Sequence, residues 1–429
     1  MKIGIVQVAL SHGGAEMVGV MLANGLFRHG HHVTIITDLN EPQIYGVDKG
    51  VSISDFIGKK TNVIFKWLKA IKNIRRIVKQ EKPDVIIGIM GICTFVTYIA
   101  CLGLRIPVVM TEHNAFERPA SAPMPLSIRF FKFWINKLYK HITVLTEADK
   151  KVIGNRLKNV TVMPNPLLLK PVEAPPKKEK IVLAAGRVDA WHVKGFDTLI
   201  CTWHKLVVSN SKIKDSGWWL KIAGNGKQES FEYLMNLLAD GEWVYNDDHL
   251  NTKYTKEKIT SAEKQNSRKS GVWRSEKYHI EFLGFQKDME SLYKKSEIFV
   301  LSSRYEGFGL VLIEAMSQGC APVACDYKGR QGEIIGDPPN CLSLRPATVG
   351  SSLNREDFQK TGIEICENGI LCEPENVEDL AKALEKMMKD EEYRKQAQQK
   401  SVERSKYYSL DNCVNRWEEY LSQVKGYSY

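Results

Sequence analysis

The sequence lacks the signals of a secreted, zinc-binding or dinucleotide-binding protein. Its nine cysteines are an odd number, and even the closest pair, Cys320 and Cys325, does not have the short spacing of a zinc site, so a reducing compartment is favoured over a disulfide framework. The apolar run after Lys2 is short and is interrupted by Gln7, which predicts a first strand rather than a signal peptide. No G-x-G-x-x-G fingerprint follows this strand, which argues against NAD binding.

Long uncharged runs are also scarce, and only the segment from Val85 to Leu104 is long enough to raise the question of a membrane-spanning helix. Pro83 and Asp84 precede a β-branched start, and glycines and threonines dilute the hydropathy of the run. We therefore expect a strand, a loop and a buried helix here, followed by a further strand, rather than a membrane span.

Charge is unevenly distributed along the 429 residues, a length that allows two folded domains. Residues 1–170 hold 23 Lys and Arg against 11 Asp and Glu, a net charge of +12, whereas residues 171–429 hold 37 against 39, a net charge of −2. The basic first half predicts an anionic partner, for which a bilayer surface, a lipid diphosphate and a nucleic acid are all candidates.

Strands and helices alternate in both halves of the chain. The chain opens with a strand, a glycine turn, an apolar helix from Met17 to His29 and a second strand, which is the unit of a doubly wound parallel sheet. A Pro- and Lys-rich stretch over 171–180 reads as a linker before a second set of strands. The pattern predicts an α/β fold with Rossmann-like domains over 1–170 and 171–411, and a separate helix over 412–429.

Several segments have less certain roles. Polar stretches near 240–278 and 337–365 are expected to be surface excursions. Residues 59–80 and Ile128 to Lys140 combine apolar and basic residues at helical spacing. Each could lie on an anionic membrane surface, or could pack its apolar side on the sheet and leave its cations in water.

The most informative segment runs from Ser303 to Ala315. Glu306 precedes two glycines, and Glu314 lies about two turns into the helix that begins after them. A glycine turn and a helix start suit a phosphate, and the two carboxylates suit the hydroxyls at either end of one ligand. An exposed loop before an amphipathic helix is the alternative, but a buried strand over Glu297 to Leu301 places the turn where α/β sheets bind ligands. The segment predicts a nucleotide-sugar site.

Several separated motifs, taken in order, resemble those of glycosyltransferase family 4, the retaining GT-B enzymes that use nucleotide-sugar donors. The resemblance covers nearly the whole chain, and within the family it points to bacterial enzymes that extend lipid-linked oligosaccharides. It implies two Rossmann-like domains facing a cleft, with the last helix returning to the first domain. The motifs are Gly13-Gly14-Ala15-Glu16, Glu112-His113-Asn114, Asn165-Pro166, Gly186-Arg187 with Lys194-Gly195, Gly224-Asn225-Gly226, and Glu306 through Glu314.

The resemblance implies catalytic roles for four side chains. Arg187 and Lys194 would hold the donor diphosphate, where fixed cations stabilise the charge of the leaving group. Glu306 would bind hydroxyls of the donor sugar and stabilise positive charge as the glycosidic bond opens. His113 would face the sugar from the first domain.

Substrate contacts are implied for a second set of residues. Glu314 would bind the ribose, amides near Phe308, Gly309 and Leu310 would support the diphosphate and sugar, and Gly14 would bring its backbone close to the phosphates. Where the family usually has Asn-Gly, this chain has Asn-Pro. The remaining expected contacts are Gly13, Glu112, Asn114 and Asn165.

The expected reaction moves a hexose or N-acetylhexosamine, with retained configuration, from a UDP-sugar to a lipid-linked glycan or polysaccharide. No cofactor and no metal are expected, because no D-x-D pair lies in a suitable loop and fixed cations can do the charge work. We expect a peripheral protein on the cytoplasmic face of the membrane, with an anionic membrane surface and no nucleic acid as partner. A nucleotide-sugar epimerase, a soluble-acceptor glycosyltransferase and a non-catalytic nucleotide-sugar or nucleic-acid binding protein are the alternatives.

Overall fold

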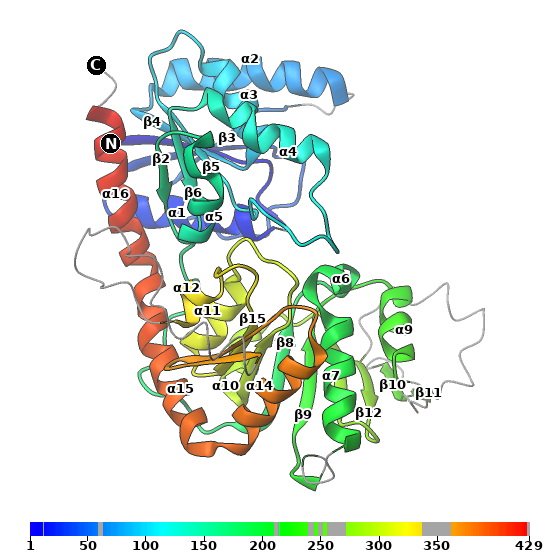
Figure 1. The fold of residues 1–429 in the computed structure, drawn as a ribbon. Helices are drawn as coiled ribbons and strands as arrows, with labels where there is room; N and C mark the ends of the chain where they lie inside the picture. The colour runs from blue at the N-terminus through cyan, green and yellow to red at the C-terminus, as the bar shows by residue number, and fades with distance from the viewer. Residues whose placement is uncertain are drawn as a thin grey trace. The chain divides into compact units, whose positions relative to one another are not determined.

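The chain folds into two units in the computed structural model (Figure 1). Unit 1 comprises Met1–Leu168 with Tyr408–Tyr429, and unit 2 comprises Leu169–Tyr407, whereas the sequence placed the divisions after residues 170 and 411. The predicted excursions near 240–278 and 337–365 fall mostly outside the described residues. The structure describes residues 1–11, 13–58, 63–209, 213, 215–238, 244–247, 252–254, 272–336 and 362–426.

Unit 1 is built on a seven-stranded sheet in the order β3-β2-β1-β4-β5-β6-β7, and every neighbouring pair is parallel. Its central strands are runs of Ile, Val and Met that are buried on both faces, as expected for a parallel sheet covered by helices. The strands are β1 (Lys2–Val6), β2 (His32–Thr37), β3 (Ser52–Asp55), β4 (Val85–Ile89), β5 (Val108–Thr111), β6 (His141–Val144) and β7 (Val160–Val162).

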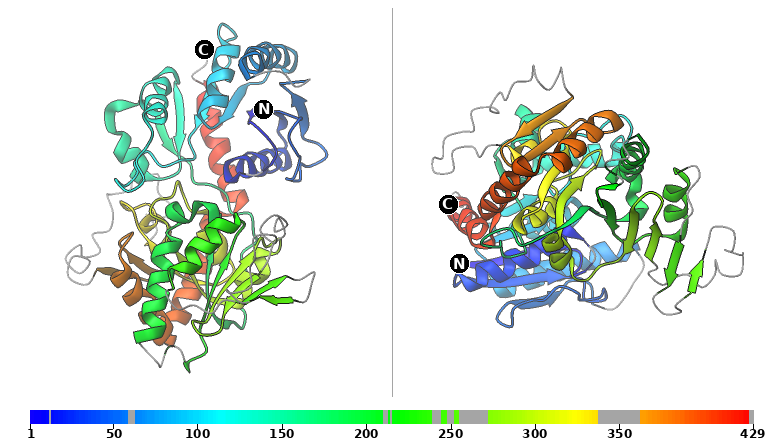
Figure 2. Two further views of the ribbon diagram at one scale, coloured as in Figure 1. Left: turned by 90° about the vertical axis from the view of Figure 1, so that its right-hand side faces the viewer. Right: turned by 90° about the horizontal axis from the view of Figure 1, so that it is seen from below.

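Two helical layers cover this sheet (Figure 2). Apolar side chains of α1 and α16 pack on one face, and those of α2 and α3 pack on the other. The helices are α1 (Gly14–Arg28), α2 (Val63–Glu81), α3 (Gly91–Cys101), α4 (Leu126–Phe133), α5 (Glu147–Ile153) and α16 (Leu410–Gly426), with short 3-10 turns η1 (Ile135–Leu138) and η2 (Gly154–Arg156).

The uncharged run from Val85 to Leu104 forms β4 and α3, and β5 follows it. The expected strand, helix and strand are therefore confirmed. Within the described part of the chain, no helix is both long enough and apolar enough to cross a membrane.

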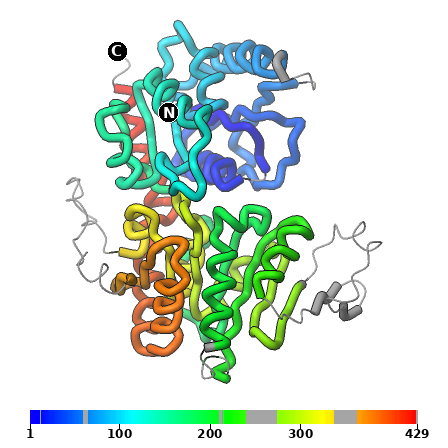
Figure 3. The backbone as a smooth tube through the Cα atoms, turned by 45° about the vertical axis from the view of Figure 1, so that its right-hand side comes forward, coloured from blue at the N-terminus to red at the C-terminus, as the bar shows by residue number. Residues whose placement is uncertain are grey.

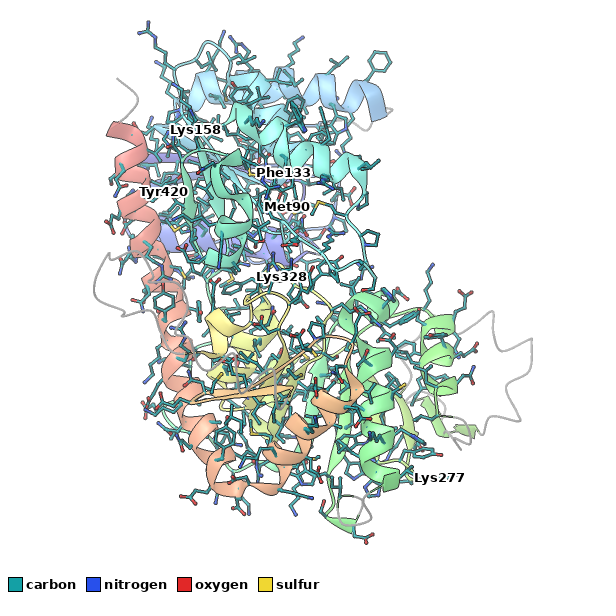
Figure 4. All side chains as sticks on the ribbon, viewed as in Figure 1. Met90, Phe133, Lys158, Lys277, Lys328 and Tyr420 are labelled. Atoms are coloured by element: carbon teal, nitrogen blue, oxygen red, sulfur yellow. The ribbon has the colours of Figure 1, made fainter. Side chains whose placement is uncertain are left out.

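The last helix, α16, returns to the first unit, as the resemblance implied (Figure 3). Val414, Trp417 and Tyr420, the last of which is labelled in Figure 4, lie in the same buried cluster as the residues of α1. The approach is close because α1 has no side chain at Gly25, where a Cβ would lie 2.5 Å from Val414 Cγ2. A bond from the Leu167 N–H to the Tyr408 carbonyl (2.6 Å) joins the two segments of unit 1.

Unit 2 has a ten-stranded mixed sheet in the order β11-β10-β12-β13-β9-β8-β14-β15-β17-β16. The strands from β13 to β17 are parallel, and antiparallel strands flank them. The strands are β8 (Glu179–Ala185), β9 (Trp219–Ala223), β10 (Val244–Asp247), β11 (Thr252–Tyr254), β12 (Val272–Ser275), β13 (Ile280–Gly284), β14 (Ser296–Leu301), β15 (Ala321–Cys325), β16 (Ile363–Cys366) and β17 (Gly369–Cys372).

Helices alternate with the parallel strands of unit 2, and their apolar faces form one buried cluster with the sheet. The loops after β8, β9 and β14 therefore meet at the carboxyl edge of neighbouring strands, where such sheets bind ligands. The helices are η3 (Val188–Ala190), α6 (Trp191–Lys194), α7 (Phe196–Ser209), α9 (Gln228–Asn236), α10 (Met289–Lys295), α11 (Leu310–Ser317), α12 (Gly332–Ile335), α14 (Val377–Lys389), α15 (Glu391–Ser405) and η6 (Lys406–Tyr408).

Candidate functional site

The loops after β8 and β9 are locked together at the sheet edge of unit 2. Gly186 donates its N–H to the Ala223 carbonyl at 3.0 Å. A Cβ at Gly224 would collide with the Gly186 carbonyl, so the sequence needs glycine at this crossing. Arg187 follows directly and is exposed. Its side chain has no ion pair or hydrogen bond to any other described residue.

Lys194 and Glu306 meet although they are far apart in the sequence. The Lys194 Nζ lies 2.6 Å from the Glu306 Oε1, and the two side chains are 23% and 14% exposed. The Ser303 hydroxyl donates to the same carboxylate oxygen at 2.7 Å. The structure thus brings together the cation assigned to the diphosphate and the carboxylate assigned to the sugar.

Arg304, which the sequence analysis did not single out, joins the two loops that carry this pair. Its guanidinium binds both Asp197 oxygens at 2.8 Å and Glu375 at 2.8 Å, and it also donates to the His192 carbonyl. Its backbone N–H donates to the Val193 carbonyl at 2.9 Å. The arginine thereby fixes the segment before Lys194 against the segment before Glu306.

A second contact between these loops needs a glycine. The Ser302 hydroxyl donates to the Lys194 carbonyl at 2.8 Å. Gly195 has a φ of +64°, and a Cβ there would collide with the Ser302 carbonyl. Both its conformation and its surroundings therefore exclude a side chain.

The helix start predicted after Glu306 is present. Gly309 precedes α11 with a φ of +96° and a ψ of 56°, and Leu310 is the first helical residue. Phe308 is buried and anchors the turn. The first amides of α11 and the positive end of its dipole therefore lie at the same sheet edge as Lys194 and Glu306.

Glu314 lies farther along α11 in a less polar environment. The Tyr293 hydroxyl donates to its Oε2 at 3.2 Å. Burial raises the pKa of Glu314 to about 7, against the opposing effect of the Tyr293 hydrogen bond. This carboxyl group therefore changes charge near neutral pH, which the spacing of the two glutamates in the sequence could not reveal.

In unit 1, Gly13 caps α1 and Gly14 is its first residue. The Gly13 carbonyl accepts a hydrogen bond from the Tyr45 hydroxyl at 3.1 Å. The Glu16 carboxylate lies directly beside Gly13, where a Cβ would displace it. The amino end of this helix follows β1 at the carboxyl edge of the sheet.

Glu112 and Asn114 are held by a buried lysine. Glu112 is 6% exposed, and its Oε2 lies 3.2 Å from the Lys132 Nζ, which is itself 3% exposed. Its Oε1 accepts the Asn114 backbone N–H at 3.0 Å, and Lys132 donates to the Asn114 carbonyl at 2.7 Å. The sequence assigned Glu112 and Asn114 to substrate, whereas these bonds hold their loop together. Burial lowers the pKa of Lys132, and the charge of Glu112 opposes that shift.

His113, on the same loop, presents one nitrogen without a partner. The Thr111 hydroxyl donates to the Gly88 carbonyl at 3.0 Å, so at 3.1 Å from His113 Nε2 it accepts a proton from the ring. This bond places the ring proton on Nε2, and Nδ1 is buried near Asn165 and makes no hydrogen bond of normal geometry to another described residue. Burial lowers the pKa of His113 to about 4, although Glu112 and the neighbouring Asn165 oppose the shift. The imidazole is therefore neutral at pH 7, and Nδ1 can accept a hydrogen bond from a hydroxyl.

The predicted residues thus form three groups at sheet edges. Gly13 and Gly14 begin α1, and the loop from Glu112 to Asn114 gathers around His113 with Asn165 in unit 1. The remaining predicted residues form the group in unit 2. Sequence reasoning missed Arg304, Lys132, Tyr293 and Thr111, whose partners come from other elements and whose local sequence carries no signal.

Two Rossmann-like units, with a lysine and a carboxylate paired at a strand-to-helix turn, are the arrangement of the GT-B fold. The family model described as Glycosyltransferase Family 4 matches residues 12–168, and the model described as Glycosyl transferases group 1 matches residues 258–390. The first half of the chain therefore carries a Glycosyltransferase Family 4 region and the second half a Glycosyl transferases group 1 region, and the resemblance seen in its motifs is confirmed.

Bacterial relatives match the chain over nearly its whole length. An uncharacterized glycosyltransferase of Haemophilus influenzae is 26% identical over 96% of this chain and 97% of its own. A Campylobacter jejuni protein is 22% identical over 99% of both chains, and it is named GalNAc-alpha-(1->4)-GalNAc-alpha-(1->3)-diNAcBac-PP-undecaprenol alpha-1,4-N-acetyl-D-galactosaminyltransferase.

Solved structures show the same fold. Sucrose-phosphate synthase of Thermosynechococcus elongatus has a TM-score of 0.68 at 16% identity, over 99% of this chain and 98% of that one. Anabaena HepE, in complex with UDP and glucose, has a TM-score of 0.65 at 15% identity, over 99% of this chain and 100% of that one. The family models identify the protein as a glycosyltransferase, and the solved structures show that it shares their fold.

Proposed function

We propose that the protein is a retaining, metal-independent transferase that moves a hexose or N-acetylhexosamine from a UDP-sugar to a lipid-linked glycan or polysaccharide. The observation that carries this proposal is the 2.6 Å pair of Lys194 and Glu306 beside the start of α11. A cation, a carboxylate and a helix amino end at one sheet edge suit the diphosphate and the hydroxyls of a single donor.

The proposed chemistry uses these groups in one step. The bond between the sugar C1 and the donor phosphate oxygen breaks, and the acceptor oxygen bonds to C1 on the same face. The departing phosphate takes the acceptor proton. Lys194, Arg187 and the amino end of α11 stabilise the charge on the leaving diphosphate, while Glu306 stabilises the positive charge that develops on the sugar.

Residues of unit 1 would act on the sugar and the acceptor. The free Nδ1 of His113 is suited to accept a hydrogen bond from a sugar hydroxyl, because the ring is neutral and its proton lies on Nε2. The lysine-held loop around it would keep that nitrogen in place. Gly14 would let the start of α1 approach the phosphates.

The donor and acceptor are proposed from chemistry and from the relatives. The HepE structure contains UDP and glucose, which supports a UDP-sugar, and the name of the Campylobacter jejuni relative specifies an undecaprenol-diphosphate glycan as acceptor. The net charge of +12 on residues 1–170 suits such an anionic lipid. We place the protein at the cytoplasmic face of the membrane, where it would be peripheral, and we assign it no nucleic-acid partner.

A panel of UDP-, GDP- and ADP-sugars, with and without EDTA, tests the proposal through nucleotide release. We expect release from one UDP-sugar that EDTA does not suppress, and a product whose anomeric configuration equals that of the donor. Arg187→Ala should reduce kcat/KM by about a hundredfold, as for loss of a cation that stabilises a leaving group, whereas the exposed control Lys277→Ala should not. Epimerised nucleotide sugar as product, or no binding of any donor, would contradict the proposal.

A further inference from the structure

Helix α4 and the turn η1 expose a stripe of large apolar side chains. Leu126, Phe130, Trp134 and Leu138 follow one another at intervals of four residues and are 82%, 52%, 63% and 44% exposed. In an α-helix that interval returns to one side, so Leu126, Phe130 and the C-cap residue Trp134 share a side of α4, and Leu138 follows them in η1. Six consecutive residues, 125–130, are exposed, so the described residues of unit 1 leave the outer face of α4 uncovered.

The polarity of α4 is the reverse of that of a surface helix. Its inner side buries the charged Lys132, and Phe133, labelled in Figure 4, packs its ring 5.7 Å from that of Phe116. Phe131 packs against Phe95 of α3, with a centroid distance of 6.1 Å. A helix that hides its lysine and shows leucine, phenylalanine and tryptophan to the outside is suited to an apolar partner.

The other amphipathic stretch, α2, does not share this property. Ala70, Ile74 and Val78 are at most 1% exposed and belong to the core on one face of the sheet. Lys66 is paired with Asp38 at 2.8 Å. Among the side chains of α2 that the structure describes, Phe65 and Leu68 are the large apolar ones that remain exposed. The structure therefore favours α4 with η1 over α2 as the exposed apolar stretch, a choice that the sequence pattern did not allow.

The charges around the stripe identify the occupant. From Leu126 to Lys140 the chain has four cations and no carboxylate. Arg129 and Lys140 are exposed, and the Lys137 Nζ lies 4.6 Å from the centre of the Trp134 ring. A second copy meeting this face symmetrically would bring cations against cations, which is unfavourable. Tryptophan and aliphatic side chains flanked by lysine and arginine instead suit the interface of an anionic bilayer.

We propose that the outer face of α4 and η1 inserts into the headgroup region of an anionic lipid bilayer. This inference rests on the proposed function in one respect: a lipid-linked acceptor lies in a bilayer, which explains why the protein would bind one. On its inner side, Lys132 of the same helix holds Glu112 and the Asn114 carbonyl. The helix that docks is therefore bonded directly to the loop that carries His113.

Vesicle flotation of the full-length protein tests the inference without donor or acceptor. We expect binding to phosphatidylcholine vesicles that contain about one third phosphatidylglycerol, weaker binding to phosphatidylcholine alone, and partial loss of binding at about 0.5 M salt. The triple variant Leu126→Ser, Phe130→Ser and Trp134→Ser should reduce the bound fraction about tenfold or more. Its melting temperature should change little, because these side chains are already exposed.

Matched variants distinguish the contribution of this face to vesicle binding from general effects of net charge and surface hydropathy. Val208→Ser removes an apolar side chain that is 62% exposed in unit 2, and it should leave flotation unchanged. One triple variant removes three cations beside the stripe: Arg129→Gln, Lys137→Gln and Lys140→Gln. It should weaken binding to anionic vesicles. A control triple variant makes the same change in net charge on unit 2 and should not weaken binding: Lys382→Gln, Lys389→Gln and Lys395→Gln.

Three results would overturn the inference. They are absence of wild-type flotation with anionic vesicles, flotation of the triple serine variant at the wild-type level, and a wild-type dimer in light scattering that the triple variant abolishes, which would assign the face to a second copy. Failure of the proposed function is seen separately. Vesicle binding without release of nucleotide from any donor would leave the docking face intact and remove the transferase.

Discussion

At the scale of single residues, the candidate site depends on side chains that contact other protein groups. Arg304 binds Asp197, Glu375 and the His192 carbonyl, and in doing so it aligns the loops of Lys194 and Glu306. Lys132 plays the same part in unit 1, where its bonds to Glu112 and to the Asn114 carbonyl hold the loop that carries His113. Such residues act on chemistry through position, because reacting groups tolerate little displacement.

We expect Arg304→Ala to reduce kcat/KM for donor turnover about tenfold or more, because Lys194 and Glu306 would lose their common support. Arg304→Lys keeps the charge but loses the bidentate contact to Asp197, so it should recover only part of the activity. Steady-state kinetics over a range of donor concentrations measures both variants. Lys382→Gln, which replaces an exposed lysine paired with the buried Asp379, is the control, and equal kcat/KM in Arg304→Ala and the wild type would refute the role.

The raised pKa of Glu314 predicts a pH dependence of stability. Its folded-state pKa is about 7 against an ordinary 4.5, so the folded protein binds this proton more tightly than the unfolded chain does. Ionising the buried Glu314 carboxyl lowers the free energy of unfolding. This destabilisation is absent below pH 4.5, grows as the pH rises, and reaches its full size above about pH 7. Relative to the wild type, Glu314→Gln should therefore gain stability between pH 5 and 8, by about 2 kcal/mol.

Melting temperatures of the two proteins across this pH range provide the measurement. The conservative variant keeps a group that can pair with the Tyr293 hydroxyl, so the comparison isolates the charge. Glu290→Gln is a suitable control, because Glu290 is an exposed glutamate in a surface pair with Lys294. A constant difference between wild type and Glu314→Gln from pH 5 to 8 would show that burial does not raise this pKa.

At the scale of elements, contacts between helices require gaps that the sequence supplies as small residues. Gly25 of α1 lies under Val414 of α16, so adding a methyl group there overfills the contact. We expect Gly25→Ala to destabilise unit 1 by about 1–3 kcal/mol. The double variant with Val414→Ala should be more stable than the sum of the single changes, because the second change removes the colliding group.

Thermal unfolding of the four proteins in this cycle measures the coupling. A Val414→Ala change alone loses buried apolar contact and should also destabilise the protein. Additive effects of the two changes, with no coupling, would mean that the helices adjust their separation freely.

Most strands and helices could be predicted because their signals are local. The run from Val85 to Leu104 shows a β-branched start, glycines and then a helix-length apolar segment, and the structure has β4 and α3 there. Which side of α4 faces the protein could not be predicted in this way. Its periodicity indicates an amphipathic helix. The side that faces inward is seen only in the structure, where Lys132 is buried and paired with Glu112.

The candidate site was predictable to a similar degree. Glycines at Gly195, Gly224 and Gly309 stand where the backbone needs them, and the sequence marks those turns. The pairing of Lys194 with Glu306 depends on the register of β8 beside β14, which no local pattern encodes. The pKa of Glu314 and the open nitrogen of His113 depend on neighbours from other elements, so they required the structure.

At the scale of the whole molecule, the chain leaves unit 1 after Leu168 and re-enters it at Tyr408. The two ends of the chain then meet near one residue. Asp84 accepts the Lys2 backbone N–H at 2.8 Å, and it pairs with the Lys425 Nζ at 3.0 Å. Unit 1 therefore brings Lys2 and Lys425 to the same residue, while unit 2 is one uninterrupted segment.

This arrangement predicts that a circular permutant will fold. A chain that begins at Tyr408, joins Tyr429 to Met1 through a short Gly/Ser linker and ends at Tyr407 would make unit 1 continuous. We expect a melting temperature within a few degrees of the wild type, and donor turnover within about threefold, because every contact of α16 with α1 is kept. Aggregation of the permutant, alongside a soluble wild type, would contradict this expectation.

The return of α16 also sets an order of events during synthesis on the ribosome. Residues 169–407 emerge as a complete segment, whereas the first 168 residues must wait with an uncovered face of α1 until the last twenty-two residues are released. A ribosome that stalls or terminates in this final stretch would therefore leave a finished second unit attached to an unfinished first one. Unit 1 can therefore be completed only after residues 169–407 of unit 2 have been synthesised.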